Sequence, residues 1–197
     1  MGGPTRGERA PAADERTPGR GPVAPMRIGV RPAEDRDGVA VGRLRSEAFG
    51  EAASRKGGRQ LLDDLAPAAE ARGSDGQLHV TLVAELLADE PAGPLPDGVV
   101  MGYAVVVAPP GAAVARLEEL YVERDARTIG IGTALLESAE RTAAGWGCEG
   151  LDSLALPGDR ATKNFFEDHG MVTRALVVHR RVDPAADGTA GDGIGDA

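Results

Sequence analysis

The chain has 197 residues, a formal charge of −9 at pH 7, and aromatic side chains at only 3% of its positions. This length suits one ordinary domain, whose core must come mainly from aliphatic side chains. The negative charge argues against a general nucleic-acid-binding role, because phosphate binding needs a dense positive surface.

Composition also bears on compartment and on metal content. Cys148 is the only cysteine, so no internal disulfide can form, and no Cys/His cluster has the spacing of a zinc site. The N-terminus lacks the apolar stretch of a signal peptide, and no apolar run approaches the length of a membrane span. We therefore expect a cytoplasmic protein with no metal, no membrane partner and no nucleic-acid partner.

The two ends of the chain have the composition of disordered segments. Residues 1–25 hold Gly, Pro, Ala and charged residues with almost no large apolar side chain, and residues 183–197 are acidic and rich in Gly and Ala. Such segments bury too little apolar surface to offset the entropy lost on ordering. We expect one folded domain at residues 26–182 between two disordered tails.

The first half of this domain is predicted to hold two strands and two helices. A short strand at residues 26–31 precedes a helix that starts at Pro32, because proline is favourable at the first helical position. The second helix carries an apolar stripe within residues 61–69. Alternating apolar residues at 78–84 predict the next strand, and residues 91–98 predict a loop.

The second half contains the predicted centre of the sheet. Val99–Ala108 is nearly all apolar, and a Pro-Pro-Gly turn leads from it to a strand at Val114–Val122. This arrangement predicts a hairpin. After Gly130, apolar side chains recur at every fourth position until a glycine-containing segment at 145–147, as in an amphipathic helix.

Three shorter elements complete the domain. A strand is predicted at 150–156, then a helix that carries Phe165 and Phe166 and is capped by Gly170, and a last strand at 171–182. This order of elements predicts an α+β fold with a mixed, mainly antiparallel sheet. The edge of the last strand could pair with a second copy and form a homodimer.

A glycine loop joins the strand that ends at Val122 to the amphipathic helix. In the run Arg127-Thr-Ile-Gly130-Ile-Gly132, the glycines lack Cβ atoms and let backbone N–H groups approach phosphate oxygens. The positive end of the helix dipole favours the same negative charge, and Arg127 can add a charge-assisted contact. These features are typical of a pyrophosphate site.

The same residues allow other interpretations of the loop. The glycines could only permit a tight strand-to-helix turn, with Arg127 on the surface. A P-loop is excluded, because no Gly-Lys-Ser/Thr follows. A dinucleotide fingerprint would need a third glycine where Leu135 stands; Asp152 lies where a ribose ligand could, but such a loop normally follows the first strand.

The block from Glu119 to Leu136 resembles the coenzyme A signature of the GNAT N-acetyltransferase superfamily. It contains Glu-Leu-Tyr-Val and then Arg127-x-x-Gly130-x-Gly132, followed by Thr-Ala-Leu-Leu. The order of elements over the folded unit resembles that fold as well, in which helices flank a mostly antiparallel mixed sheet. The resemblance implies an N-acetyltransferase that depends on acetyl-CoA.

The resemblance also implies roles for individual residues. Backbone groups of Leu120, Tyr121 and Val122 would bind the pantetheine arm and the acetyl carbonyl. The pyrophosphate would be held by the loop and the first helical turn: Arg127, Thr128, Ile129, Gly130, Ile131, Gly132 and Thr133. Thr128 stands where the family often has another glycine. Asn164 on the later helix is a further candidate contact to coenzyme A, although an exposed helix asparagine needs no such role.

Direct acetyl transfer needs a base that accepts a proton from the attacking ammonium group. Similar enzymes often use a side chain on the strand that ends at Val122, and Glu118 has the matching position and face. Glu119 is the second choice, for the case in which the register of the strand differs by one residue. Both glutamates could also be ordinary solvated charges at a strand edge.

The proton donor to the leaving thiolate is less well marked. Many relatives carry a tyrosine on the later helix, at the position of Phe166. Because Phe166 has no hydroxyl group, it and Phe165 are expected to pack in the core and against coenzyme A. Tyr103, Tyr121 or water could serve as the donor.

The sequence thus predicts transfer of an acetyl group from acetyl-CoA to a primary amine on a small molecule, a protein N-terminus or a lysine. The alternative is a non-catalytic acyl-CoA sensor or interaction module that has kept the cofactor site and lost the acid. A nucleotide-dependent oxidoreductase is a third and more distant hypothesis.

Overall fold

The computed structural model describes residues 26–70, 73, 76–88 and 98–180. Both predicted tails, and all of the predicted 91–98 loop except its last residue, lie outside the described residues. The chain divides into two compact units, the first up to Asp159 and the second from Arg160.

A single mixed sheet forms the centre of the first unit. Its described strands lie in the order of the chain: β1 (Met26–Pro32), β2 (Leu78–Ala88), β3 (Val99–Ala108), β4 (Val114–Val122) and β5 (Gly150–Ser153). The first four pair antiparallel and β5 pairs parallel with β4. The predicted fold class, an α+β fold with a mainly antiparallel mixed sheet, is therefore confirmed.

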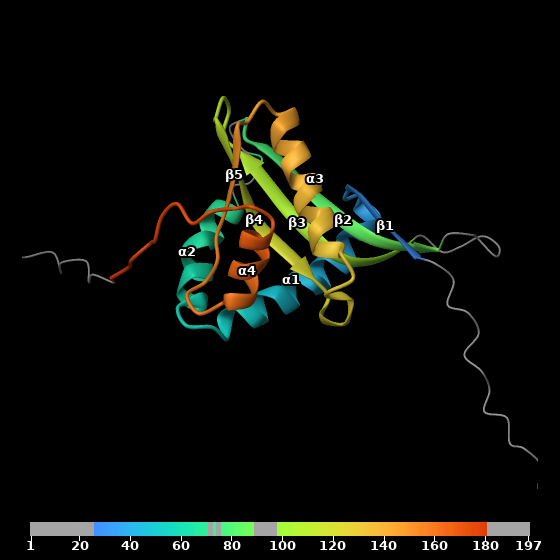
Figure 1. The fold of residues 1–197 in the computed structure, drawn as a ribbon, viewed down its shortest axis with the longest axis horizontal. Coiled ribbons are helices and arrows are strands. Elements are labelled where there is room, and N and C mark those ends of the chain that lie inside the picture. The colour runs from blue at the N-terminus through green and yellow to red at the C-terminus, as the bar shows by residue number, and fades with distance from the viewer. Residues whose placement is uncertain (1–25, 71–72, 74–75, 89–97, 181–197) are drawn as a thin grey trace, which may run out of the picture. The chain divides into compact units, whose positions relative to one another are not determined.

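Helices cover both faces of this sheet (Figure 1). The helices of the first unit are α1 (Gly38–Ala53), α2 (Gly58–Glu70) and α3 (Ile131–Gly145), and short 3₁₀ turns lie at Asp35–Asp37 and Arg124–Ala126. The second unit contains α4 (Arg160–Asp168).

Two neighbouring residues of β3 show which helix lies on which face. A Cβ atom on Gly102 would lie 3.1 Å from side-chain atoms of both Ile131 and Leu135, so this position faces α3. Tyr103 lies in the buried cluster that includes Leu44 of α1. Since successive strand residues point to opposite faces, α1 and α3 pack on opposite sides of the sheet.

The first helix begins later than predicted. Pro32 is the last residue of β1 and pairs with Leu82, so it does not start a helix. The extended path continues through Ala33, whose N–H donates to the Thr81 carbonyl at 2.8 Å. The helix starts at Gly38, because pairing with the sheet outweighs the preference of proline for a first helical position.

The predicted strand at 171–182 is wrong for the part that the structure describes. Residues 171–180 have no regular secondary structure, and Val172, Leu176, Val177 and Val178 are exposed. An apolar run becomes a strand only where another strand offers hydrogen bonds, and the run itself does not specify that partner. The helix cap before it is confirmed: Gly170 has a φ of 81°, and the Met171 N–H donates to the Phe166 carbonyl at 3.0 Å.

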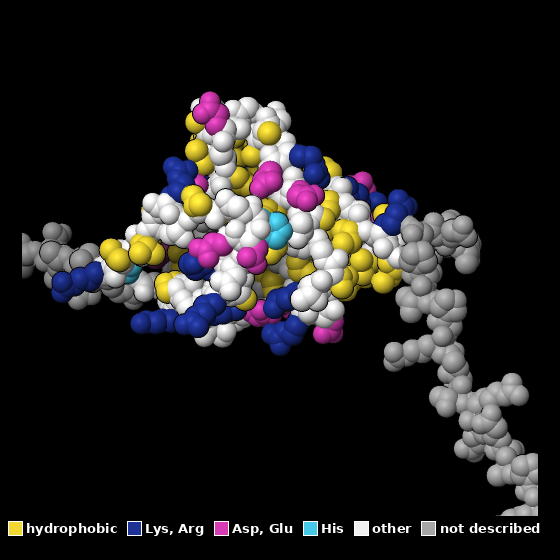
Figure 2. All heavy atoms as spheres, viewed as in Figure 1, with side chains coloured by type: hydrophobic (Ala, Val, Ile, Leu, Met, Phe, Trp, Pro, Cys, Tyr) yellow, Lys and Arg dark blue, Asp and Glu magenta, His cyan; other side chains and the backbone are white. Residues whose placement is uncertain are grey.

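Two surface properties bear on partners. Figure 2 shows acidic and basic side chains interspersed over the face that it presents, without a continuous field of one sign. Among the helices in the described ranges, none combines the length and the apolar character needed to cross a bilayer.

Candidate active site

The strand β4 carries a β-bulge at the predicted base. Val105 pairs with Glu119, whereas the next residue of β3, Val106, pairs with Leu117. The register therefore shifts by one residue at Glu118. A bulge of this kind bends the strand and redirects its side chains.

The strand β5 accompanies β4 over only part of its length. It pairs with residues Val114 to Leu117 of β4. The last pair joins Leu117 to Ser153, the residue at which β5 ends. The predicted strand to residue 156 is thus three residues too long. Beyond Leu117, the side of β4 that faces β5 has no partner strand among the described residues, so the backbone of Leu120, Tyr121 and Val122 makes no ladder hydrogen bonds to β5.

The two candidate bases have different surroundings. Glu118 accepts a hydrogen bond from Arg116 at 2.9 Å. Glu119 is the more buried, and its Oε2 accepts hydrogen bonds from the Tyr103 hydroxyl and from Arg45 Nε, both at 2.9 Å. Burial, together with the adjacent Glu119 carboxylate, raises the pKa of Tyr103 well above its usual value.

Tyr121 lies opposite two carboxylates of α1. Its hydroxyl donates to Glu51 at 2.9 Å and approaches Glu47 at 3.4 Å. Burial and the hydrogen bond to Glu51 raise the pKa of Tyr121 to about 12. Tyr103 and Tyr121, two of the candidate proton donors, therefore both have their hydroxyl hydrogens directed at carboxylates.

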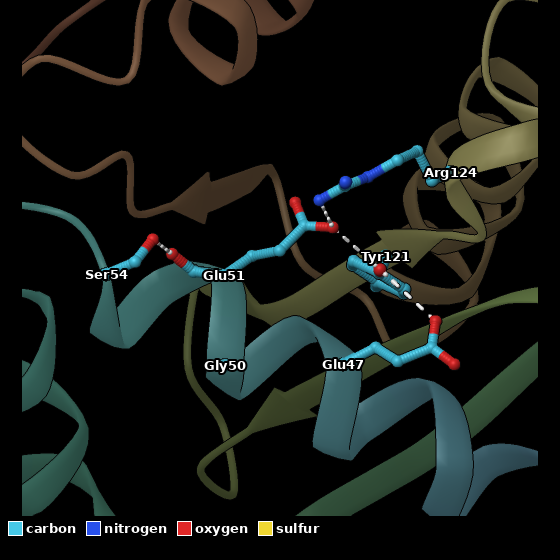
Figure 3. A pocket seen from close by; sticks show the side chains of 6 residues that line it. All are labelled: Glu47, Gly50, Glu51, Ser54, Tyr121 and Arg124. Atoms are coloured by element: carbon cyan, nitrogen blue, oxygen red, sulfur yellow. Dashed lines mark hydrogen bonds and ion pairs between the residues drawn. The ribbon is translucent and has the colours of Figure 1, made fainter.

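A hollow of about 500 Å³ opens between α1 and the end of β4. Figure 3 shows the carboxylates of Glu47 and Glu51, one helical turn apart, directed toward the Tyr121 hydroxyl, with Arg124 reaching Glu51 from another side. Gly50 and Ser54 complete the lining. Both carboxylates are already paired with guanidinium groups, Glu47 with Arg43 and Glu51 with Arg124 and Arg127.

The glycine loop has the backbone that a close approach of phosphate requires. Gly130 is the N-cap of α3 with a φ of 98°, and no side chain caps the helix. Thr128 also has a positive φ, 75°, and is the only non-glycine residue of the described chain that does. Residues 127–130 are all exposed. The first N–H groups of α3, which have no partner within the helix, directly follow this exposed loop.

The Arg127 side chain is held within the protein. Its Nε donates to the Val122 carbonyl at 3.0 Å, and its Nη2 lies 3.0 and 3.1 Å from the two carboxylate oxygens of Glu51. The guanidinium also lies over the Tyr121 ring, 5.1 Å from its centroid.

The structure brings most of the predicted cofactor residues together. The Leu120 to Val122 segment and the Arg127 to Thr133 segment meet at one end of β4, joined by the Arg124–Ala126 turn. Asn164 and Phe166 lie on α4 in the second unit. There the Phe166 ring contacts the Phe165 ring edge-on, with centroids 5.4 Å apart. The cofactor role of every residue in this set stays a prediction.

Sequence reasoning missed Glu51. It lies 70 positions before Tyr121 and 76 before Arg127, and no local pattern connects residues so far apart. The one weak signal is that Glu47 and Glu51 are four residues apart on a helix, and so must share a face.

Comparison with known proteins agrees with this geometry. Residues 88–171 match the model of the Acetyltransferase (GNAT) family. No curated protein sequence matches the chain.

Several solved structures share the fold. One is the aminoglycoside N-acetyltransferase AAC(6')-Iy in complex with CoA, at 18% identity and a TM-score of 0.58, covering 80% of this chain and 96% of that one. Another is a ribosomal-protein-alanine N-acetyltransferase from Brucella melitensis biovar Abortus 2308, at 17% identity and a TM-score of 0.53, covering 79% and 99%.

These identities establish similarity of fold, and the family match covers the loop and both strands that position it. Residues 88–171 therefore match the GNAT acetyltransferase family, and the chain has the fold of solved N-acetyltransferases.

Proposed function

We propose that this protein transfers the acetyl group of acetyl-CoA to a primary amine of a small molecule or a protein. The observation that carries the proposal is the meeting of three features at one end of β4. They are the incomplete pairing with β5, the uncapped N-terminus of α3, and the hollow lined by Glu47 and Glu51.

The described residues fit the cofactor. Gly130 and Thr128, with positive φ, turn the chain into α3, whose first N–H groups would give a diphosphate hydrogen-bond donors and a favourable dipole. Arg127 would add charge. The backbone of Leu120, Tyr121 and Val122, beyond the reach of β5, would hold the pantetheine arm. Acetyl-CoA would supply an acetyl group activated as a thioester.

The hollow supports an amine as the acceptor. Its lining includes two carboxylates, Glu47 and Glu51, which an ammonium group would contact in competition with the arginines that pair with them. Two proteins of similar fold have names that identify amine acceptors, an aminoglycoside in one and a ribosomal-protein alanine in the other. Small amines, protein N-termini and lysines therefore form the set to test.

The acceptor's ammonium group must lose a proton to the protein before the amine can attack. We assign this to Glu118, with Glu119 as the second choice. The base accepts a proton from the ammonium group, the nitrogen lone pair forms the new C–N bond, and the C–S bond breaks. The nitrogen then loses its second proton, which protonates the departing thiolate directly or through water. Glu118 lies at the bulge, where the strand bends, and its Oε1 contacts Arg116.

Acceptor profiling tests the proposal. The protein is incubated with acetyl-CoA and a panel of aminoglycosides, diamines, amino acids and peptides with free N-termini, and release of free thiol is followed together with the mass of the product. We expect acetylation of at least one cationic amine. Tight coenzyme A binding with no turnover on the whole panel would instead support the acyl-CoA sensor, and absence of coenzyme A binding would overturn both.

A further inference from the structure

The two arginines at the glycine loop share one carboxylate. Glu51 accepts hydrogen bonds from Arg127 at 3.0 and 3.1 Å and from Arg124 at 3.2 Å. It belongs to α1, whereas both arginines follow β4. Glu51 thus gathers the positive side chains that lie between the end of β4 and the start of α3 (Figure 3 shows the contact with Arg124).

A carboxylate and a phosphate both accept hydrogen bonds from the N–H groups of an arginine side chain. In this structure Arg127 Nη2 already donates to both oxygens of Glu51. A phosphate that binds through the same nitrogen therefore competes with this carboxylate. The Arg127 side chain is 40% exposed, and that of Arg124 is 74% exposed, so an anion from solvent can reach either.

Glu51 is charged in this arrangement. Burial acts to raise its pKa, but the hydrogen bonds from Tyr121 and Arg127 outweigh burial and hold the pKa below its usual value. At neutral pH a full negative charge therefore lies against Arg127. A second anion that approaches the same arginine has to compete with it.

We propose that Glu51 is a positioning residue that competes with the cofactor diphosphate for Arg127, and that cofactor binding moves the Arg127 fork from this carboxylate to the diphosphate. The inference rests on the proposed function, because it takes the diphosphate to bind at the loop. It adds a residue from α1 that sets cofactor affinity without itself contacting the cofactor.

A double-mutant cycle measured with coenzyme A tests this. Dissociation constants are determined by calorimetry for the wild type, Glu51→Gln, Arg127→Ala and the double variant. Glutamine keeps the size of the side chain and an acceptor for the Tyr121 hydroxyl but removes the charge. We expect Glu51→Gln to lower the dissociation constant of coenzyme A about threefold to fivefold. This decrease corresponds to the free energy of a partly exposed ion pair. In the Arg127→Ala background the same change should have little effect.

Glu47→Gln is the matched control. Glu47 lies one turn away on α1 and approaches the same tyrosine hydroxyl, but its ion pair is with Arg43. It should leave coenzyme A affinity nearly unchanged. Glu51→Asp, which retracts the carboxylate by one methylene, should tighten binding in the same direction and serves if the glutamine variant does not fold.

Three results would overturn the inference: no tightening by either Glu51 variant, equal tightening with and without Arg127, or equal tightening by Glu47→Gln, which would indicate only a general field effect. If the wild type fails to bind coenzyme A, the proposed function itself fails, and the two failures are thereby distinguished.

Discussion

Thr128 has a backbone conformation that suits glycine, with a φ of 75°. The αL region costs an ordinary residue about 1–2 kcal/mol, whereas glycine adopts it freely. The resemblance to GNAT enzymes placed a glycine at this position in many relatives, and the backbone angle supplies the physical reason.

We expect Thr128→Gly to raise the free energy of unfolding by up to about 1 kcal/mol, because relief of the αL cost exceeds the extra entropy of glycine in the unfolded chain. Urea denaturation measures this. Ile129→Gly is the control: Ile129 has no positive φ, so glycine there should lower stability by about 0.5–1 kcal/mol. Loss of stability in Thr128→Gly would show that the side chain stabilises the loop.

The two glutamates of β4 can be separated by kinetics. If Glu118 is the base, Glu118→Gln should lower turnover at neutral pH about 100-fold or more, while the dissociation constant of coenzyme A stays unchanged. Glu119→Gln should lower thermal stability, because Glu119 accepts hydrogen bonds from Tyr103 and Arg45. A fully active Glu118→Gln would pass the role to Glu119 or to water.

At the scale of single elements, the N-terminus of α3 is the feature on which cofactor binding depends. Gly132 lies in its first turn. We expect Gly132→Asp to abolish coenzyme A binding, because it puts bulk and negative charge where the diphosphate would lie. The protein should still fold, since an aspartate in a first turn favours the helix. Calorimetry gives the affinity and circular dichroism checks the fold.

Gly132→Ala is the control for that substitution. It adds a methyl group without charge at a helical position, so measurable coenzyme A binding should remain. If Gly132→Asp binds coenzyme A as tightly as the wild type, the α3 N-terminus has no part in the cofactor site.

The packing of β3 against α3 depends on a second glycine. A Cβ atom on Gly102 would lie 2.9 Å from the Tyr121 carbonyl oxygen and 3.1 Å from both Ile131 and Leu135. We expect Gly102→Ala to lower the free energy of unfolding by about 1–3 kcal/mol. Gly145→Ala, at the end of α3 with nothing within 4 Å, should be neutral or slightly stabilising. Similar values for the two variants in urea would contradict the close packing.

For the molecule as a whole, the dependence of stability on pH involves ion pairs that join β1, β2 and the turn before α1. Asp37 is buried and accepts two hydrogen bonds from Arg31, at 2.6 and 2.9 Å, and Arg31 also pairs with Glu85 of β2. The hydrogen bond from Arg31, opposed by burial, lowers the pKa of Asp37. This carboxylate therefore stabilises the fold above its ordinary pKa of about 4, and the contribution is lost as the pH falls through the lower folded value.

We expect Asp37→Asn to cost about 1–3 kcal/mol of unfolding free energy at pH 7 and to make stability less dependent on pH below 4. Denaturation at several pH values measures both effects. Asp35→Asn, an exposed change in the same turn, should alter neither. An unchanged pH dependence in Asp37→Asn would assign the acid sensitivity to other carboxylates.

The sequence alone determined those parts of the protein in which neighbours along the chain carry the information. The apolar run of β3, the turn after it and β4 have the predicted bounds, and the four-residue apolar spacing located α3, because strand and helix periods are local properties. The loop that precedes α3 could also be located from the sequence, because its glycines and the start of the helix lie within six positions.

Only the tertiary structure decided which distant groups meet. The bulge at Glu118 depends on the register with β3, and the start of α1 depends on the pairing of Pro32 with β2. Residues 171–180 form no strand, and none of the described strands pairs with them. Glu51 reaches Tyr121 and Arg127 across 70 and more residues. Contacts of this kind arise from how elements pack against one another, and no pattern within a single element specifies them.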